Sequence, residues 1–159
     1  MKNILKAITL LFTVSLIAQS HEIIKHNGTK LEVNYIKAEY NLIYYSVPSN
    51  MVEQKISKYA VAQLNDKLKS SSEIISEKNQ LIQQSDYRKV IILKEFETVG
   101  LKRSEEITSF IGKVKGQTNY ELKKLKENNL QRKAAMKGAP FIVLISTDPE
   151  NLKAVTYTY

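Results

Sequence analysis

Five acidic residues in the second half of the chain are the candidates for catalysis: Glu95, Glu97, Glu105, Glu106 and Asp148. Hydrolysis of a glycosidic bond needs two carboxylates that face each other across a cleft. Glu105 and Glu106 are adjacent, so on a strand their side chains would point to opposite faces of the sheet. No other spacing among these acids suggests a facing pair. The sequence therefore favours a non-enzymatic protein and leaves a carboxylate-based hydrolase as the weaker alternative.

Metal and nucleophile chemistry has even fewer candidates. The chain contains no cysteine, and its two histidines, His21 and His26, both lie near the start. Thiolate zinc sites, cysteine nucleophiles and disulfides are therefore excluded. We predict no catalytic residue, no metal ligand and no cofactor.

The charge balance argues against nucleic-acid binding. The formal net charge is +8, from 24 Lys plus Arg against 16 Asp plus Glu, but only three arginines occur, at positions 88, 103 and 132. Proteins that read nucleic acids usually rely on arginine to bind base edges and to stack on rings. A lysine-rich excess is more typical of a solvated surface.

One expected helix, residues 119–137, carries many of these basic side chains. Thr118 and Glu121 fit a capping box at its start, and Gly138 followed by Pro140 marks its end. The apolar stripe is imperfect, so a kink near the middle is one alternative. The basic residues of the helix are Lys123, Lys124, Lys126, Arg132, Lys133 and Lys137. Such a run is usually a solvated face, and the alternative is a surface that binds anionic lipid or polysaccharide.

Residues 1–20 have the pattern of a signal peptide. Lys2 and Lys6 give a positive start, residues 7–18 form an apolar run, and Ala18-Gln19-Ser20 supplies small residues for cleavage. The apolar run is short for a membrane span, so we expect cleavage after Ser20 rather than an uncleaved anchor. The mature protein is then expected to be periplasmic or secreted, without a membrane span and without a cysteine for lipid attachment.

Residues 21–80 are expected to form a small β-domain. Asn27-Gly28 is a strong hairpin signal, and residues 42–47 are strand-forming residues bounded by turn residues. A meander of about five short strands favours a small antiparallel β-barrel of the SH3 or OB type. Residues 57–69 leave two alternatives open, because they fit either strand structure or, by their apolar spacing, a helix.

Tyr44 and Tyr45 are the candidates for an exposed aromatic binding face. As neighbours on a strand they point to opposite sides of the sheet. One of them is expected in the core, and the other is free to be exposed. Ordinary packing is the favoured interpretation of both.

Residues 87–159 are expected to form an α+β domain, preceded by a linker at residues 81–86. The expected strands are residues 87–94, 107–114, 141–145 and 155–159. The run Phe141–Ile145 is apolar throughout, which is typical of a strand buried on both faces. With the helix after the second strand, the order predicts a β-β-α-β-β unit in which one helix packs on a sheet.

The second half also resembles known domains. Val99-Gly100-Leu101 and Phe110–Gly116 precede the helix, which ends in Ala134-Ala135-Met136-Lys137-Gly138-Ala139 and leads into the apolar strand. This arrangement is similar to exported Gram-negative bacterial proteins of unknown function. Their second half resembles the YbjQ-type heavy-metal-binding domain and the periplasmic domain of the Rcs envelope-stress sensor lipoprotein. Residues 56–61 and 71–76 are similar to the β-domain that precedes this unit in such proteins.

The resemblance to the Rcs sensor implies an envelope protein that acts by contact with other proteins. The metal-binding role of the YbjQ-type domain does not carry over, because the second half contains no cysteine or histidine. We therefore expect an exported, non-enzymatic envelope protein whose partner is another envelope protein.

Overall fold

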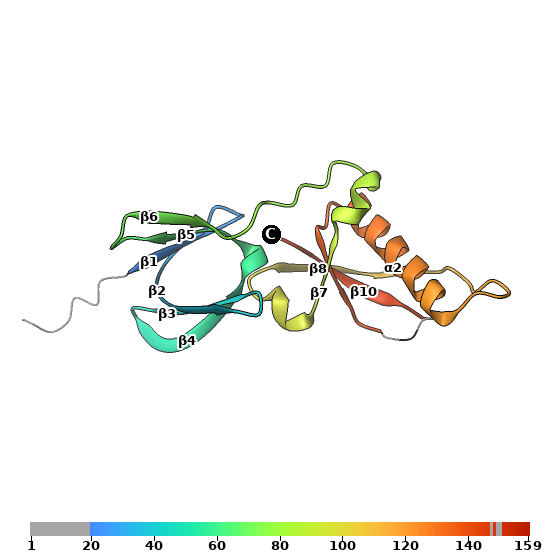
Figure 1. Ribbon diagram of the computed structural model, residues 1–159, viewed down its shortest axis with the longest axis horizontal. Coiled ribbons are helices and arrows are strands. Elements are labelled where there is room, and N and C mark those ends of the chain that lie inside the picture. Colours follow the sequence, from blue (N-terminus) through green and yellow to red (C-terminus); the bar gives the residue numbers. More distant parts are fainter. Residues whose placement is uncertain (1–19, 147, 149–150) are drawn as a thin grey trace, which may run out of the picture.

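The computed structural model describes residues 20–146, 148 and 151–159, which form two β-sheets and one long helix (Figure 1). This mixed architecture confirms the predicted α+β class. Almost all of the predicted signal peptide lies outside the described residues. Within the part of the chain that is described, no helix has the length and apolar character that a bilayer span requires.

The first half is a six-stranded sheet with the order β4-β3-β2-β1-β5-β6, in which every neighbouring pair is antiparallel. Its strands are β1 (His21–Lys25), β2 (Lys30–Glu39), β3 (Leu42–Val47), β4 (Asn50–Ser57), β5 (Val61–Asp66) and β6 (Ser71–Ile74). The core of this half includes Ile23, Val33, Ile43, Ile56 and Val61.

The small barrel of the SH3 or OB type that the sequence predicts is not present as a closed sheet among the described residues. The strand order is linear, with β4 and β6 at the two edges, and no pairing between them joins the ends among the described residues. All four residues of β6 are exposed, and three of them are polar. Closing the sheet at this strand would bury serine and glutamate side chains with little apolar surface in return.

Local turn chemistry in this sheet agrees with the sequence. Gly28 has a φ of +87° in the β1–β2 hairpin, and Tyr40 and Asn41 have φ values of +47° and +63° between β2 and β3. Two central residues with positive φ match the type I′ turn that suits the twist of a hairpin. The strand interpretation of residues 57–69 is confirmed, since a short 3₁₀ turn, η1 (Lys58–Ala60), leads directly into β5.

The second half has a four-stranded sheet with the order β7-β9-β10-β8. Its elements are β7 (Ile91–Leu93), β8 (Lys102–Thr108), α2 (Asn119–Met136), β9 (Phe141–Leu144) and β10 (Lys153–Thr158). β7 and β9 are parallel, and β10 pairs antiparallel with both β9 and β8. The β-β-α-β-β order is therefore as predicted.

Two strands of this half lie elsewhere than predicted. The segment expected as a strand from Tyr87 begins instead with a 3₁₀ helix, η2 (Gln84–Lys89), and only Ile91–Leu93 is strand. Asp86 holds the 3₁₀ turn, because its carboxylate accepts hydrogen bonds from the backbone N–H groups of Ile82 and Gln83 and pairs with Lys89 at 2.9 Å.

The strand predicted at residues 107–114 overlaps the observed β8 only at its first two residues. β8 is a charged strand at the edge of its sheet, so most of its side chains face water and give no apolar signal. Residues after Thr108 leave the sheet and form a loop that leads to α2.

The ends of α2 follow the predicted capping pattern. Thr118 Oγ1 accepts a hydrogen bond from the Glu121 N–H at 3.2 Å, and the Glu121 carboxylate accepts one from the Thr118 N–H at 2.9 Å. The Thr118 N–H and then the Thr118 hydroxyl, which both donate to the Glu121 carboxylate, lower the pKa of Glu121. At the other end Gly138 has a φ of +65°, and Ala139 N–H donates to Ala134 O at 2.9 Å, which closes a Schellman motif. The helix runs unbroken between these caps.

β9 is buried on both faces because it lies between α2 and the first half. Ile142 packs with the α2 residues Leu130 and Ala134, whereas Phe141 and Val143 belong to a second apolar cluster. Tyr59, from η1 of the first half, packs against that second cluster, and its ring centroid lies 5.6 Å from that of Phe141. Burial of β9 between α2 and the first half explains why the run Phe141–Ile145 is apolar throughout.

Polar contacts also join the two halves. Ser57 N–H donates to Val99 O at 2.8 Å, and Asn41 Nδ2 donates to the buried Glu97 carboxylate at 2.8 Å. Glu97 belongs to a 3₁₀ helix, η3 (Glu95–Thr98), between β7 and β8. The segment predicted as a linker is anchored as well, since Leu81 packs against the core under α2. The halves therefore form one packed unit.

Candidate functional site

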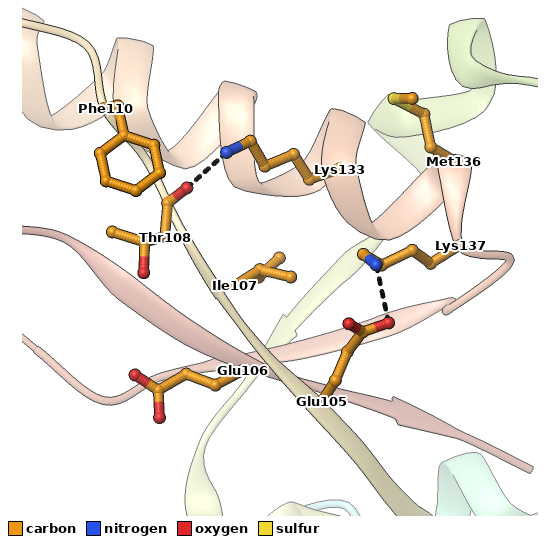
Figure 2. A pocket seen from close by; sticks show the side chains of 8 residues that line it. All are labelled: Glu105, Glu106, Ile107, Thr108, Phe110, Lys133, Met136 and Lys137. Atoms are coloured by element: carbon orange, nitrogen blue, oxygen red, sulfur yellow. Dashed lines mark hydrogen bonds and ion pairs between the residues drawn. The ribbon is translucent and has the colours of Figure 1, made fainter.

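A shallow groove of about 650 Å³ lies between β8 and the last turns of α2 (Figure 2). Its lining residues are Glu105, Glu106, Ile107, Thr108, Phe110, Lys133, Met136 and Lys137. β8 is the last strand in the sheet order and, among the described residues, pairs only with β10. The groove therefore combines an unpaired strand edge with one side of a helix.

The hydrogen-bond pattern shows which backbone groups of β8 face outward. Ser109 N–H donates to Leu152 O at 3.2 Å, on the side of β10. Because alternate residues of a strand bond in opposite directions, Glu106 and Thr108 direct their backbone groups to the outer edge. Lys133 Nζ donates to Thr108 O at 2.6 Å, so α2 already contacts this edge.

The groove also exposes large apolar side chains. Phe110 and Met136 are 85% and 67% exposed, while Ile107 is buried between them and the core. Lys133 Nζ lies 5.0 Å from the centroid of the Phe110 ring, within the range of a cation–π interaction. These side chains give the groove two apolar contact points beside a row of backbone donors and acceptors.

The acids of the groove are paired with lysines. Glu105 Oε1 lies 2.8 Å from Lys137 Nζ across the groove (Figure 2). Glu106 Oε1 lies 3.8 Å from Lys153 Nζ. Figure 2 shows the two carboxylates directed apart, as expected for neighbours on a strand. They do not form the facing pair that glycosidase chemistry needs.

The other candidate acids lie away from this groove. Glu97 is buried where the halves meet, and its second carboxylate oxygen accepts a hydrogen bond from Lys94 N–H at 2.7 Å. Glu95 is exposed on the same 3₁₀ helix, η3, and Asp148 follows β9. Among the described residues no cluster of three or more His, Asp or Glu side chains could hold a metal ion.

The predicted cationic surface of α2 is not a single face. Lys126 is buried, Lys133 and Lys137 point into the groove, and Lys123 Nζ lies 4.0 Å from Glu127. Arg132 places its guanidinium carbon 4.7 Å from the centroid of the Tyr87 ring. Hydrogen bonds and charge from Arg88 and then Arg132 lower the pKa of Tyr87.

Lys124 is exposed near the first turns of the helix. The six basic residues are thus distributed among the groove, the protein interior and separate parts of the surface.

The two tyrosines of the predicted aromatic face also separate. Tyr45 is buried in the core of the first sheet, and burial raises the pKa of its hydroxyl. Tyr44 is half-buried and lies under Lys37, whose Nζ is 5.0 Å from its ring centroid. One tyrosine is therefore a core residue, as expected, and the other packs against a neighbouring strand.

Sequence reasoning missed the groove because its two walls come from distant segments. Phe110 and Met136 are separated by the whole of α2, and only the fold brings them to the same strip of surface. The one available signal was the charged run Lys102–Glu106, which is typical of an edge strand.

Comparison of the chain with family models, curated proteins and solved structures gave no match.

Proposed function

We propose that the protein is an exported, non-enzymatic envelope protein that binds a protein partner. The groove between β8 and α2 takes an extended segment of that partner as an added strand. The observation that carries this proposal is the unpaired edge of β8 beside the exposed Phe110 and Met136. An added strand gains main-chain hydrogen bonds, and apolar contacts beside the edge select alternate side chains.

The location of α2 favours this edge over the others. β4, β6 and β7 are also edge strands, but β4 and β6 belong to the first half, away from α2 (Figure 1), and β7 has only three residues. A peptide on β8 would have the sheet edge on one side and the helix on the other. Lys133 and Lys137 would then lie beside the peptide and could pair with its acidic side chains.

A non-enzymatic role is supported by how the acidic residues are used. Glu105 and Glu106 each pair with a lysine, and Glu97 joins the two halves by hydrogen bonds. Glu105 and Glu106 are directed apart and Glu97 lies away from the groove, so these three acids do not face one another across a cleft as hydrolysis would need (Figure 2). The hydrolase alternative therefore receives no support from the site.

Peptide selection tests the proposal. The chain from His21 onward, which contains every described helix and strand, is used to select binders from a displayed library of random peptides. We expect Phe110→Ser combined with Met136→Ser to lower the affinity for the selected peptides by about tenfold, because exposed apolar anchors usually dominate such contacts. Hydrogen exchange should show new protection of the outward N–H groups of Glu106 and Thr108.

The matched control changes two apolar residues of another edge strand. Met51 and Val52 on β4 are 64% and 65% exposed, similar to Met136. Replacing both with serine should leave peptide affinity unchanged. Peptides that depend on Met51 and Val52, or that protect no amide of β8, would contradict the proposed site.

Export is a separate part of the proposal and rests on residues 1–20. Expression of the full chain in a Gram-negative host should give a mature protein outside the cytoplasm. Its intact mass should correspond to a start at His21. A chain that keeps its first residues and stays in the membrane fraction would favour the uncleaved anchor instead.

The resemblance to known domains is also part of the proposal. It rests on the sequence alone, on residues 99–101, 110–116 and 134–139. We propose from it only the envelope location and the contact with proteins. Metal binding is not part of the proposal.

A further inference from the structure

A second surface lies at the other end of α2, outside the groove. The loop before α2 and the first turns of the helix form the end of the molecule farthest from the first sheet (Figure 1). A shallow depression there is lined by Val114, Lys115, Gln117, Tyr120, Glu121, Lys124 and Leu125. We call this surface the tip.

The tip exposes apolar side chains that the fold does not cover. Val114, Tyr120 and Leu125 are 68%, 72% and 45% exposed. All three line the same depression, so they form a group of exposed apolar residues rather than scattered ones. A patch of this kind indicates contact with another molecule or with a membrane.

Hydrogen bonds hold the loop in position against the helix. Gly116 has a φ of +85°, and Gln117 N–H donates to Val114 O at 3.0 Å across the turn. Lys113 Nζ donates to Asn119 Oδ1 at 2.8 Å and so ties the loop to the first residue of α2. The loop therefore presents Val114 beside Tyr120 without having to be ordered on binding.

The charge of the tip is positive. The lysines of the loop and of the first turns of α2 are Lys113, Lys115, Lys123 and Lys124. The acid that lines the depression, Glu121, is engaged with Thr118 in the capping box. Lys115 and Lys124 flank the apolar patch directly. Lysine around an exposed apolar patch is the composition of surfaces that bind anionic bilayers.

We propose that the tip docks onto an anionic lipid bilayer. Val114 and Tyr120 enter the headgroup region, and Lys115 and Lys124 contact lipid phosphates. Tyrosine is suited to this depth because its ring is apolar and its hydroxyl stays hydrated. A polysaccharide would use the lysines but would leave Val114 and Leu125 exposed, so the apolar patch favours lipid. This surface shares no lining residue with the groove and goes beyond the proposed function.

Vesicle sedimentation tests the docking. The chain from His21 onward is used, so that the apolar amino terminus cannot contribute. We expect it to bind phosphatidylcholine vesicles that contain phosphatidylglycerol and to leave pure phosphatidylcholine vesicles unbound. Lys115→Gln with Lys124→Gln should weaken binding by at least about tenfold, since each lysine near an anionic surface contributes strongly. Val114→Ser with Tyr120→Ser should also weaken it.

The matched charge control removes two lysines from the first half. Lys30 and Lys55 are exposed on β2 and β4, and their replacement by glutamine changes the net charge by the same amount. Binding should then fall by less than about twofold. An equal loss with this pair would show attraction by net charge alone and would overturn the proposal. Thermal unfolding of each variant shows that it is folded.

A fluorescent reporter tests insertion directly. The chain contains no tryptophan, so Tyr120→Trp gives a single probe at the tip and Met51→Trp gives one on β4. We expect the emission of the first probe alone to shift to the blue on anionic vesicles. No shift at position 120, or a dimer that Val114→Ser with Tyr120→Ser abolishes without any vesicle binding, would overturn the proposal.

Discussion

Replacing Gly138 with valine is expected to destabilise the protein through backbone strain alone. Gly138 has a φ of +65°, and a Cβ built at this position would meet no atom of the described residues within 4 Å. The open space excludes a steric clash with the following strand as a cause. Close packing between the helix and the strand is therefore not the reason for glycine here.

The size of the effect follows from two opposing contributions. The left-handed conformation costs an L-residue about 1–2 kcal/mol, and a β-branched side chain suffers most. Loss of a glycine also reduces the conformational entropy of the unfolded chain, which stabilises the folded state by roughly 0.4–1 kcal/mol. We expect the free energy of unfolding to fall by about 1 kcal/mol, which is roughly 2–4 °C in melting temperature for a chain of this size.

Gly112 supplies a matched control. A Cβ there also meets nothing within 4 Å in the part of the chain that the structure describes, but Gly112 is not among the glycines with positive φ. Gly112→Val should therefore leave stability within about 0.5 kcal/mol of the parent or raise it slightly. Gly138→Asn should cost less than Gly138→Val, because asparagine tolerates the left-handed region.

Urea unfolding gives the free energy of unfolding of all three variants, and the midpoints can be compared directly if the m-values are equal. If Gly138→Val and Gly112→Val shifted the midpoint equally, the strain argument at the helix cap would be refuted.

Three further changes test the interior. Gly100→Ala should cost about 2–4 kcal/mol, because φ is +88° and the new Cβ would lie 2.7 Å from Ile56 Cγ1, as thermal unfolding would show. Burial, and then the charge of Lys78, lowers the pKa of His26, so the folded state disfavours its protonation. The stability that neutral His26 contributes is present above pH about 6.5 and is lost as the pH falls below that value. His26→Gln should therefore make the melting temperature depend less on pH. Ser109→Ala should raise the free energy of unfolding in urea by about 1 kcal/mol, since its buried hydroxyl has no hydrogen-bond partner among the described residues.

Local chemistry made parts of the second half predictable. Thr118, Glu121 and Gly138 act within one helical turn of their own positions, so their roles could be read without the fold. The apolar run that became β9 was equally clear, because burial on both faces removes every polar residue from the strand. These features give the correct order of elements around α2.

The misplaced elements are those that depend on partners far away in the chain. β8 is a charged edge strand whose position is fixed by pairing with β10, including the hydroxyl of Thr156, which bonds to both backbone groups of Glu105. The open form of the first sheet depends on β6, whose exposed polar residues provide no apolar surface for closure. Neither feature has a local pattern that distinguishes it from a loop or a barrel strand.

The candidate sites were harder to predict than the fold for the same reason. The lysines of α2 form one cluster in the sequence, but helical geometry turns Lys126 into the interior and Lys133 toward β8. What remains at the surface is divided between the groove and the tip. Contacts such as that of Phe110 with Lys133 exist only once the loop has folded back along the helix.

The two proposed surfaces should act independently, because they occupy opposite ends of a rigid element. α2 has 18 residues, so with a rise of about 1.5 Å per residue its ends are roughly 27 Å apart. Met136 belongs to the last turn and Tyr120 to the first. Changes at sites this far apart are normally additive.

We therefore expect Val114→Ser with Tyr120→Ser to leave peptide affinity at the groove unchanged, and Met136→Ser to leave vesicle binding unchanged. Peptide binding measured on protein already attached to vesicles gives the decisive result. An affinity equal to that in solution would mean that the membrane-bound protein still offers β8 to a partner. A large loss would show that peptide and bilayer compete for the same surface, and the assignment of two separate sites would then be wrong.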